Sequence, residues 1–374
     1  MKYLFTTVLL ITAFSISAQE YYLLVGTYNS PKSEGVYVYR FNSTNGNATE
    51  ISHVKTSNPS FLAISPDEKL VYAVHEDADN NGKGGEVASF SFDKSKGMLT
   101  FINKQSSGGD HPCYVAVDKT GKWVFAGNYT SGSLSMLKAN KDGHLDPAST
   151  VIQHEGYSVN SERQNSPHVH CTVLSPDNKY LYVADLGIDK IMTYAFNAKK
   201  GTLSNSRAGY IMTEPGSGPR HIAIHPNGRF VYLIEELTGS IVAYKDFGNA
   251  DLQELQTISA LPPAYDGPVG SADIHVSPDG KFVYASNRGE SNTIGIFKVN
   301  KETGTLMPVS HISTLGKKPR NFNFDPTGSY LLVGNQDSDE IVIFKRDKET
   351  GLLTDSGKRI SVGKPVCIKW ISTK

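Results

Sequence analysis

The chain has 374 residues, and its 37 basic and 37 acidic side chains give a formal net charge of zero at pH 7. This balance excludes the strongly basic surface typical of nucleic-acid-binding proteins and gives no reason to expect an anionic membrane surface as a partner. The three cysteines, Cys113, Cys171 and Cys367, are an odd number, so at least one thiol must be free. We expect all three to be small buried residues. A bridge between Cys113 and Cys171 is the weaker alternative, because disulfide geometry is demanding.

Residues 1–19 have the pattern of a cleavable secretory signal. Lys2 supplies a positive start, residues 4–16 are mostly apolar, and Ser17 and Ala18 offer small residues for cleavage. The apolar run is too short to span a membrane, and no cysteine follows it to carry a lipoprotein anchor. We therefore expect cleavage near Ala18, export to the periplasm without a membrane anchor, and a mature domain of residues 20–374.

The rest of the chain is a sevenfold repeat with a period of about 50 residues. Three kinds of stretch each occur seven times, as exemplified by residues 58–64, 70–74 and 35–39. These stretches are rich in Val, Ile, Tyr and Phe and are predicted to be strands. Turns such as Ser-Pro-Asp-Gly-Lys at 277–281 separate the first two strands, because Pro fixes φ and Asp and Gly tolerate the conformation that follows. A fourth, weaker run closes each unit, as at residues 252–259.

Seven four-stranded units predict an all-β fold, a seven-bladed β-propeller. The chain begins in a strand of the second type at Tyr21 and ends in a strand of the first type at residues 364–370, with nothing after it to complete that unit. We therefore expect the N-terminal and C-terminal strands to pair in one blade and close the ring. A solenoid would instead need caps at both ends.

The repeat allows equivalent positions to be compared within this one sequence. In a propeller, the start of the first strand and the end of the second strand of each blade lie at the same mouth of the central channel. The position at the start of the first strand is occupied, in chain order, by Ser60, Cys113, His170, Arg220, Ala272, Arg320 and Val366. The position at the end of the second strand is occupied by Tyr28, Glu76, Tyr129, Leu186, Glu236, Arg288 and Gln336. Structural positions in repeats tend to be apolar and repetitive, so these polar, irregular columns predict a functional site at this mouth.

Two less specific interpretations of these columns stay open. Arg220 and Glu236 lie on adjacent antiparallel strands, so they could form an ion pair that only stabilises the blade. Clustered histidines could bind zinc, but neither a His-x-Glu nor an HExxH spacing is present. We therefore expect no metal and no other cofactor.

Five short motifs fall in register in five of the predicted blades. They are Asn-Pro-Ser-Phe-Leu-Ala from 58, Gly-Asn-Tyr-x-x-Gly-Ser from 127, Ala-Asp-Leu-Gly-x-Asp from 184, Gly-Pro-Arg-His from 218 and Ala-Asp-Ile-His from 272. Together they resemble the lactonase family of seven-bladed propellers, which includes cycloisomerase-type 6-phosphogluconolactonases and 3-carboxy-cis,cis-muconate lactonizing enzymes. The resemblance covers nearly the whole chain after the signal.

The resemblance implies a catalytic site of one histidine, one glutamate and two arginines. The matching positions are His170, Glu236, Arg220 and Arg288, which the comparison of columns also selects. Around them, the expected substrate-binding residues are Glu76, Tyr129, Asn128, His168, Arg320 and Asp273.

The implied activity is hydrolysis of a sugar-acid lactone, like that of a 6-phosphogluconolactonase, on a small anionic substrate. Arg220 and Arg288 would hold the anion and stabilise the oxyanion. We expect His170 to take the proton from water, with Glu236 orienting it or shuttling the proton, because a carboxylate beside two arginines is a poor base. No Gly-x-Ser-x-Gly elbow is present, so we expect no acyl-enzyme.

The export signal argues against phosphogluconolactone itself, since that compound is a cytoplasmic metabolite. Two alternatives therefore stay open beside lactone hydrolysis. One is a lactonizing cycloisomerase that acts on a muconate. The other is a non-catalytic exported propeller that binds a small anion, a glycan or a protein, because a fold alone does not imply catalysis.

Overall fold

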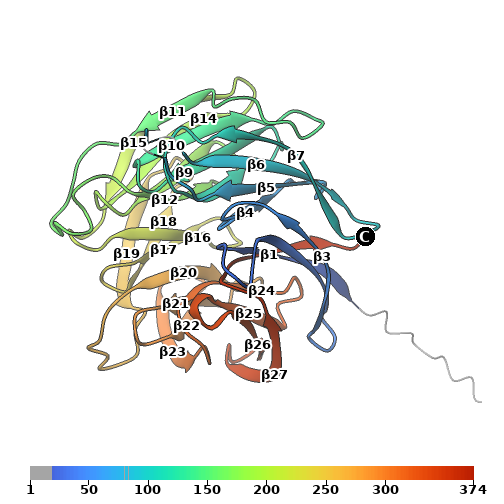
Figure 1. The fold of residues 1–374 in the computed structure, drawn as a ribbon. Helices are drawn as coiled ribbons and strands as arrows, with labels where there is room; N and C mark the ends of the chain where they lie inside the picture. Colours follow the sequence, from blue (N-terminus) through green and yellow to red (C-terminus); the bar gives the residue numbers. More distant parts are fainter. Residues whose placement is uncertain (1–18, 80, 83) are drawn as a thin grey trace, which may run out of the picture.

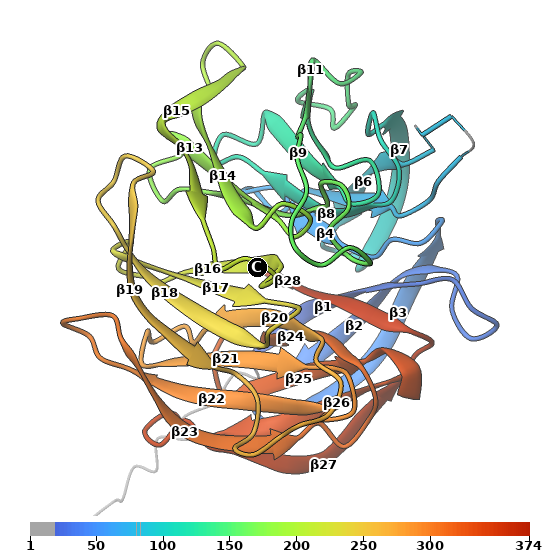
Figure 2. The same cartoon turned by 90° about the vertical axis from the view of Figure 1, so that its left-hand side faces the viewer.

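The structure is a computed structural model that describes residues 19–79, 81–82 and 84–374. The expected signal peptide, residues 1–19, lies outside the described residues except for Gln19. Within the described part, the chain forms seven four-stranded antiparallel sheets, and its one helical element is the short 3₁₀ turn η1 (Gln336–Ser338). The sheets are arranged as blades around a central axis (Figures 1 and 2). The predicted all-β, seven-bladed β-propeller is therefore confirmed.

The strands of each blade run in order from the channel to the outer edge. The blade that holds both ends of the chain consists of β28 (Pro365–Ser372), β1 (Glu20–Thr27), β2 (Gly35–Asn42) and β3 (Asn47–Lys55). The next three blades consist of β4 (Leu62–Ile64), β5 (Leu70–His75), β6 (Glu86–Asp93) and β7 (Met98–Ser106), then β8 (Pro112–Val117), β9 (Trp123–Asn128), β10 (Ser133–Lys138) and β11 (Thr150–Gln153), then β12 (Val169–Leu174), β13 (Tyr180–Asp185), β14 (Lys190–Asn197) and β15 (Thr202–Met212). The last three consist of β16 (Pro219–Ile224), β17 (Phe230–Glu235), β18 (Ser240–Asp246) and β19 (Leu252–Ser259), then β20 (Ser271–Val276), β21 (Phe282–Asn287), β22 (Thr293–Val299) and β23 (Leu306–Ser313), then β24 (Pro319–Phe324), β25 (Tyr330–Asn335), β26 (Glu340–Arg346) and β27 (Leu353–Ser361).

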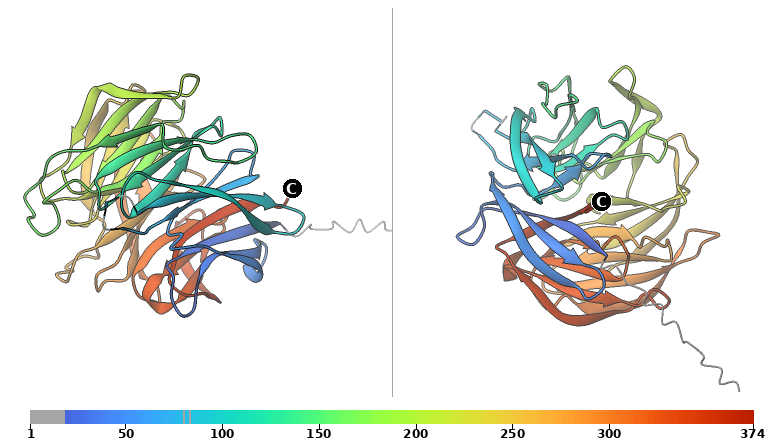
Figure 3. Two further views of the ribbon diagram at one scale, coloured as in Figure 1. Left: turned by 45° about the horizontal axis from the view of Figure 1, so that its top comes forward. Right: turned by 90° about the vertical axis from the view of Figure 1, so that its right-hand side faces the viewer.

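The ring is closed by the two ends of the chain, as the sequence predicts. The last strand, β28, pairs antiparallel with β1, with Leu24 opposite Lys369. Figure 3 shows the blue N-terminal strands beside the red C-terminal strand. This pairing joins residues more than 300 positions apart and leaves no blade incomplete.

The core lies between neighbouring blades and is filled by side chains of the first three strands of each blade. Tyr232 on β17 is completely buried, and its hydroxyl donates to the carbonyl of Gly304 in the next blade at 2.9 Å. Gly304 has φ of +78°, and a Cβ there would lie 2.3 Å from the ring of Phe230. Each blade therefore fits against a turn of the next, and this contact fixes the relative positions of the strand ends.

All three cysteines are buried and free, so the alternative of a bridge between Cys113 and Cys171 is not found. In the part of the chain that the structure describes, no helix has the length and apolar character needed to cross a membrane.

Candidate functional site

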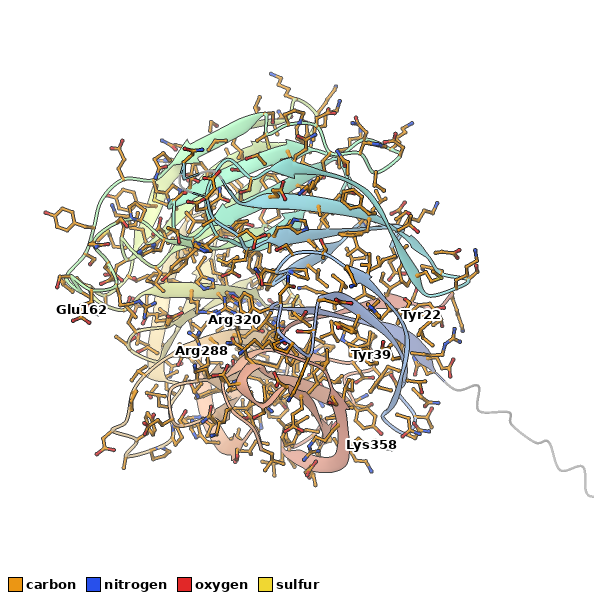
Figure 4. All side chains as sticks on the ribbon, in the orientation of Figure 1. Tyr22, Tyr39, Glu162, Arg288, Arg320 and Lys358 are labelled. Atoms are coloured by element: carbon orange, nitrogen blue, oxygen red, sulfur yellow. The ribbon has the colours of Figure 1, made fainter. Side chains whose placement is uncertain are left out.

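A cavity of about 230 Å³ opens at the predicted mouth of the channel. Its lining residues are Tyr28, Glu76, Cys113, Tyr129, Arg163, His170, Glu236, Arg288 and Arg320. All of these except Arg163 belong to the two columns of strand ends compared in the sequence. Arg288 and Arg320 are labelled close together near the centre of the molecule in Figure 4.

A β-bulge at the start of the inner strand points one side chain of each of several blades into this region. On β16, Pro219 pairs with Glu235 and His221 pairs with Ile234, so Arg220 is the extra residue between them. The same register shift leaves one residue without an opposite partner on each of β8, β12 and β24. These residues are Cys113, His170 and Arg320, respectively. Bulges release a residue from the regular alternation and re-aim its side chain, which is why they are common beside active sites.

The residues at the ends of the second strands are fixed by a shared backbone contact. The N–H of Glu236 donates to the carbonyl of Gly218 at 2.8 Å, and the N–H of Arg288 donates to the carbonyl of Gly270 at 3.1 Å. The equivalent bond joins Glu76 to Asn58 at 3.1 Å. Every blade therefore presents this position at the same height on the mouth, whatever side chain it carries.

Three guanidinium groups surround the carboxylate of Glu236. Its Oε2 accepts hydrogen bonds from Arg220 Nε at 2.8 Å and forms an ion pair with Arg288 Nη2 at 2.9 Å. Its Oε1 accepts a hydrogen bond from Arg163 Nη2 at 2.7 Å. Burial alone would raise the pKa of Glu236, but Arg288 and Arg220 outweigh that effect and hold the pKa well below its ordinary value. Glu236 is therefore ionised and is a weak base.

Glu76 lies on the other side of the cavity and has a simpler environment. Tyr28 donates its hydroxyl to Glu76 Oε2 at 2.8 Å, and Arg320 Nη2 lies 3.9 Å from the same oxygen. The Arg320 guanidinium also covers the ring of Tyr28 at 5.4 Å. Here a single guanidinium neutralises a single carboxylate.

The cavity carries an excess of positive charge. Arg220 lies directly behind Glu236 and belongs to the same group of charges. With it, four guanidinium groups face two carboxylates, which leaves an excess of two positive charges. Burial, together with Arg288 and Arg320, lowers the pKa of Arg220 to about 10, so that Arg220 is still charged at neutral pH. Such a cavity favours an anionic ligand.

His170 is the histidine that lines the cavity. It is buried, its Nδ1 lies 3.7 Å from Cys113 Sγ, and its ring packs edge-on against Tyr129 and His221 at 5.5 and 5.2 Å between centroids. Burial and the charge of Arg220 hold the pKa of His170 well below its ordinary value. The imidazole is therefore unprotonated at neutral pH and able to accept a proton.

His221 and Asp273 lie deeper in the channel, behind His170. The carboxylate of Asp273 bonds His221 Nδ1 at 2.7 Å and His275 Nε2 at 3.0 Å. Burial and Arg220 lower the pKa of His221 to about 4. Asp273 is thus engaged below the cavity and does not line it.

The structure brings together most of the residues expected at the site. Those lining the cavity are His170, Glu236, Arg288, Glu76, Tyr129 and Arg320, with Arg220 directly behind them. His168 lies at the rim, where its ring stacks on Tyr129 at 4.5 Å and its Nδ1 bonds the Tyr129 carbonyl.

Asn128 points away from the cavity and is completely buried. Its Nδ2 donates to the carbonyl of Ser107 at 3.1 Å. Asn287 and Asn335 occupy the equivalent position in their blades and also donate to the carbonyls that follow an outer strand. A contact repeated in three blades is a structural one.

Sequence reasoning missed three lining residues, Tyr28, Cys113 and Arg163. Tyr28 and Cys113 stand in the compared columns, and their equivalence to Glu236 and Arg220 was the available signal. Arg163 lies outside every strand. Among the described residues, no group of three or more His, Cys, Asp or Glu is placed to hold a metal ion.

Comparisons with known proteins agree with the fold. A family model described as "Lactonase, 7-bladed beta-propeller" matches residues 22–370. The chain is 39% identical over 350 residues to a 6-phosphogluconolactonase of Bacillus subtilis, covering 93% of this chain and 97% of the relative. It is 40% identical over 335 residues to a 6-phosphogluconolactonase of Formosa agariphila, covering 88% and 94%.

A solved structure is equally similar over its whole length. The periplasmic gluconolactonase of Pseudomonas aeruginosa superposes with a TM-score of 0.91 at 36% identity, covering 95% of this chain and 100% of that chain. The repeat, the fold and these relatives together place the chain in the lactonase family of seven-bladed β-propellers.

Proposed function

We propose that this protein hydrolyses the lactone of a sugar acid, as a 6-phosphogluconolactonase does, in the cavity at the channel mouth. The observation that carries the proposal is the arrangement of one neutral histidine beside an excess of two positive charges in a cavity of about 230 Å³. The names of the relatives supply the reaction class.

Lactone hydrolysis needs a base for water and a cation for the developing oxyanion. His170 is the base in this proposal, because it lines the cavity and its neutral ring has a nitrogen lone pair for the proton of water, whereas both carboxylate oxygens of Glu236 are engaged by arginines. Water adds to the lactone carbonyl as His170 takes its proton, and the oxygen of that carbonyl becomes an anion facing Arg288 and Arg320. The ring C–O bond then breaks, and the leaving alkoxide receives the proton from His170, which gives the open hydroxy acid.

Glu236 has a positioning role in this mechanism. It holds Arg220 and Arg288 in place, so that their charges are fixed before the substrate enters. Such preorganisation is the main source of electrostatic stabilisation in enzymes, because no reorientation is needed during the reaction.

The cellular compartment of the protein affects which lactone it can meet. We propose export to the periplasm, supported by the signal pattern of residues 1–19 and by the relative named a periplasmic gluconolactonase. The substrate pair to compare is therefore glucono-δ-lactone and its 6-phosphate.

The test is a hydrolysis assay of residues 20–374 on both lactones, followed by acid release and corrected for spontaneous opening. His170→Ala is expected to lower kcat by about 10²- to 10⁴-fold, the usual contribution of a general base. The matched control is His53→Ala, since His53 is an exposed histidine on the outer strand β3. Wild-type rates in both His170→Ala and Glu236→Ala would contradict the assignment.

The same protein samples distinguish the two alternatives. Consumption of 3-carboxy-cis,cis-muconate without lactone hydrolysis would identify a cycloisomerase. A sugar or anion that raises the melting temperature without being converted would identify a binding protein.

A further inference from the structure

Arg163 is the one arginine of the cavity that does not come from a strand end. It lies on the connection between β11 and β12, residues 154–168, and its side chain reaches Glu236 Oε1 at 2.7 Å and the Tyr129 hydroxyl at 3.2 Å. This green connection passes in front of the inner strands in Figure 2, and Glu162, next to Arg163, is labelled at the outer edge of the molecule in Figure 4. Arg163 therefore reaches the cavity from a connection and not from a strand end.

The connection is built to hold Arg163 in that place. Gln164 is completely buried, and its Nε2 donates to the Leu186 carbonyl at 2.9 Å and to Asp189 Oδ1 at 2.7 Å. The backbone N–H groups of Arg163 and Gln164 both donate to the carbonyl of Asn160, which makes a tight turn. Arg163 thus leaves an anchored backbone and not a loose loop.

The same anchor is shared with the inner strand that carries Arg220. The carboxylate of Asp189 accepts the backbone N–H of Gly218 at 2.8 Å and that of Gly216 at 2.7 Å. It also accepts the Ser158 hydroxyl from the connection itself. The position of Arg163 is therefore tied to that of the buried charges behind it.

Arg163 differs from the other two partners of Glu236 in its exposure. Its side chain is 42% exposed, against 1% for Arg220 and 17% for Arg288. Both of its hydrogen bonds come from Nη2, and among the described residues neither Nε nor Nη1 has a partner. The free Nε and Nη1 donors lie on different edges of the guanidinium, so each can donate a charge-assisted hydrogen bond to a carboxylate or phosphate.

The charge of Arg163 also contributes to the positive excess of the cavity. Arg220 and Arg288 already surround the carboxylate of Glu236, so the third guanidinium adds positive charge at the entrance. An anionic group arriving from solvent meets Arg163 first.

We propose that Arg163 binds an anionic substituent of the lactone, a phosphate or a carboxylate remote from the ring carbonyl, and so determines the preference of the enzyme for charged over uncharged lactones. The inference rests on the proposed lactone hydrolysis and adds to it the residue that recognises the charge of the substrate.

The test compares three lactones that differ at one position: glucono-δ-lactone, its 6-phosphate, and a glucarolactone that carries a carboxylate there. Arg163→Gln is expected to lower kcat/KM for whichever charged lactone the wild type prefers by about 10- to 100-fold, through KM, because a charge-assisted hydrogen bond is lost. The loss for the uncharged lactone should be smaller, so the ratio of kcat/KM between the charged and the uncharged lactone should fall, and Arg163→Lys should recover part of that ratio.

The control variant is Arg359→Gln, which removes an arginine from the outer strand β27, where it pairs with Asp355. Calorimetric titration with inorganic phosphate gives a readout that needs no turnover, and Arg163→Gln should weaken its binding about tenfold or more. If the wild type hydrolyses no lactone but loses phosphate binding in Arg163→Gln, lactone hydrolysis is wrong and the anion-binding role stands. An unchanged ratio between charged and uncharged lactones, or unchanged phosphate binding, overturns the role of Arg163.

Discussion

The two sides of the cavity contain the same residue types in different proportions. On one side, Glu236 is surrounded by three guanidinium groups at 2.7 to 2.9 Å. On the other, Glu76 has one guanidinium at 3.9 Å and a tyrosine hydroxyl at 2.8 Å. The whole positive excess of the cavity therefore lies on the Glu236 side, with His170 between the two.

This difference indicates separate roles for the two carboxylates. Glu236 keeps three like charges together around its buried carboxylate, where they would otherwise repel one another. A single guanidinium, that of Arg320, neutralises Glu76, so this side of the cavity has no excess charge. The Glu236 side is thus the side that attracts an anion.

Removing the charge of each carboxylate should show the largest contrast. Glu236→Gln leaves three guanidinium groups close together without their counter-ion, so the free energy of unfolding should fall by about 3–5 kcal/mol. Glu76→Gln retains an oxygen to accept from Tyr28 and should cost about 1 kcal/mol. Urea unfolding of the two variants measures this, and equal losses would contradict the contrast between the sides.

A third carboxylate, Glu235, is adjacent to Glu236 and has no guanidinium partner in the part of the chain that the structure describes. Its Oε1 is buried without a hydrogen bond within the described residues, and Thr238 donates to Oε2 at 3.2 Å. Burial raises the pKa of Glu235 to about 7 from 4.5. Above pH 4.5 the unfolded chain therefore loses this proton before the folded chain does, so ionisation lowers stability as pH rises to about 7 and the loss persists at higher pH.

Glu235→Gln should remove this pH-dependent loss. Asn128, Asn287 and Asn335 carry an amide at the same position in other blades, so the replacement suits the site. Relative to the wild type, the variant should gain about 3 kcal/mol of unfolding free energy at pH 8 and about nothing below pH 4.5. Unfolding curves at the two pH values test this, and a difference that does not change with pH would show that Glu235 does not titrate as described.

Much of the site followed from the repeat, because equivalent strand ends meet at one mouth. His170, Glu236 and Arg288 could be selected in this way. The side chains of Asn128 and Asp273 could not be placed correctly, since each lies one residue away from a column and alternation turns it toward the neighbouring blade.

Arg163 could not be found from the columns at all. Its place depends on a connection anchored by the hydrogen bond from Gln164 to Asp189, and Gln164 lies outside the repeated stretches of the sequence. Because Arg163 lies outside the repeat, the sequence did not reveal that three guanidinium groups surround Glu236. Comparing the blades with one another identifies residues at equivalent strand positions. An irregular connection has no equivalent in the other blades, so its residues cannot be identified in this way.

The most direct test of the account is the pH dependence of kcat/KM for lactone hydrolysis, which reports the ionisation of the free enzyme. Burial and Arg220 depress the pKa of His170, so the neutral base persists into acid, and activity should fall only well below the ordinary value of 6.5. His170→Ala should lower the rate and abolish this acid limb. A wild-type midpoint at or above pH 6.5, or an acid limb that survives in His170→Ala, would contradict the assignment of His170 as the base that activates water.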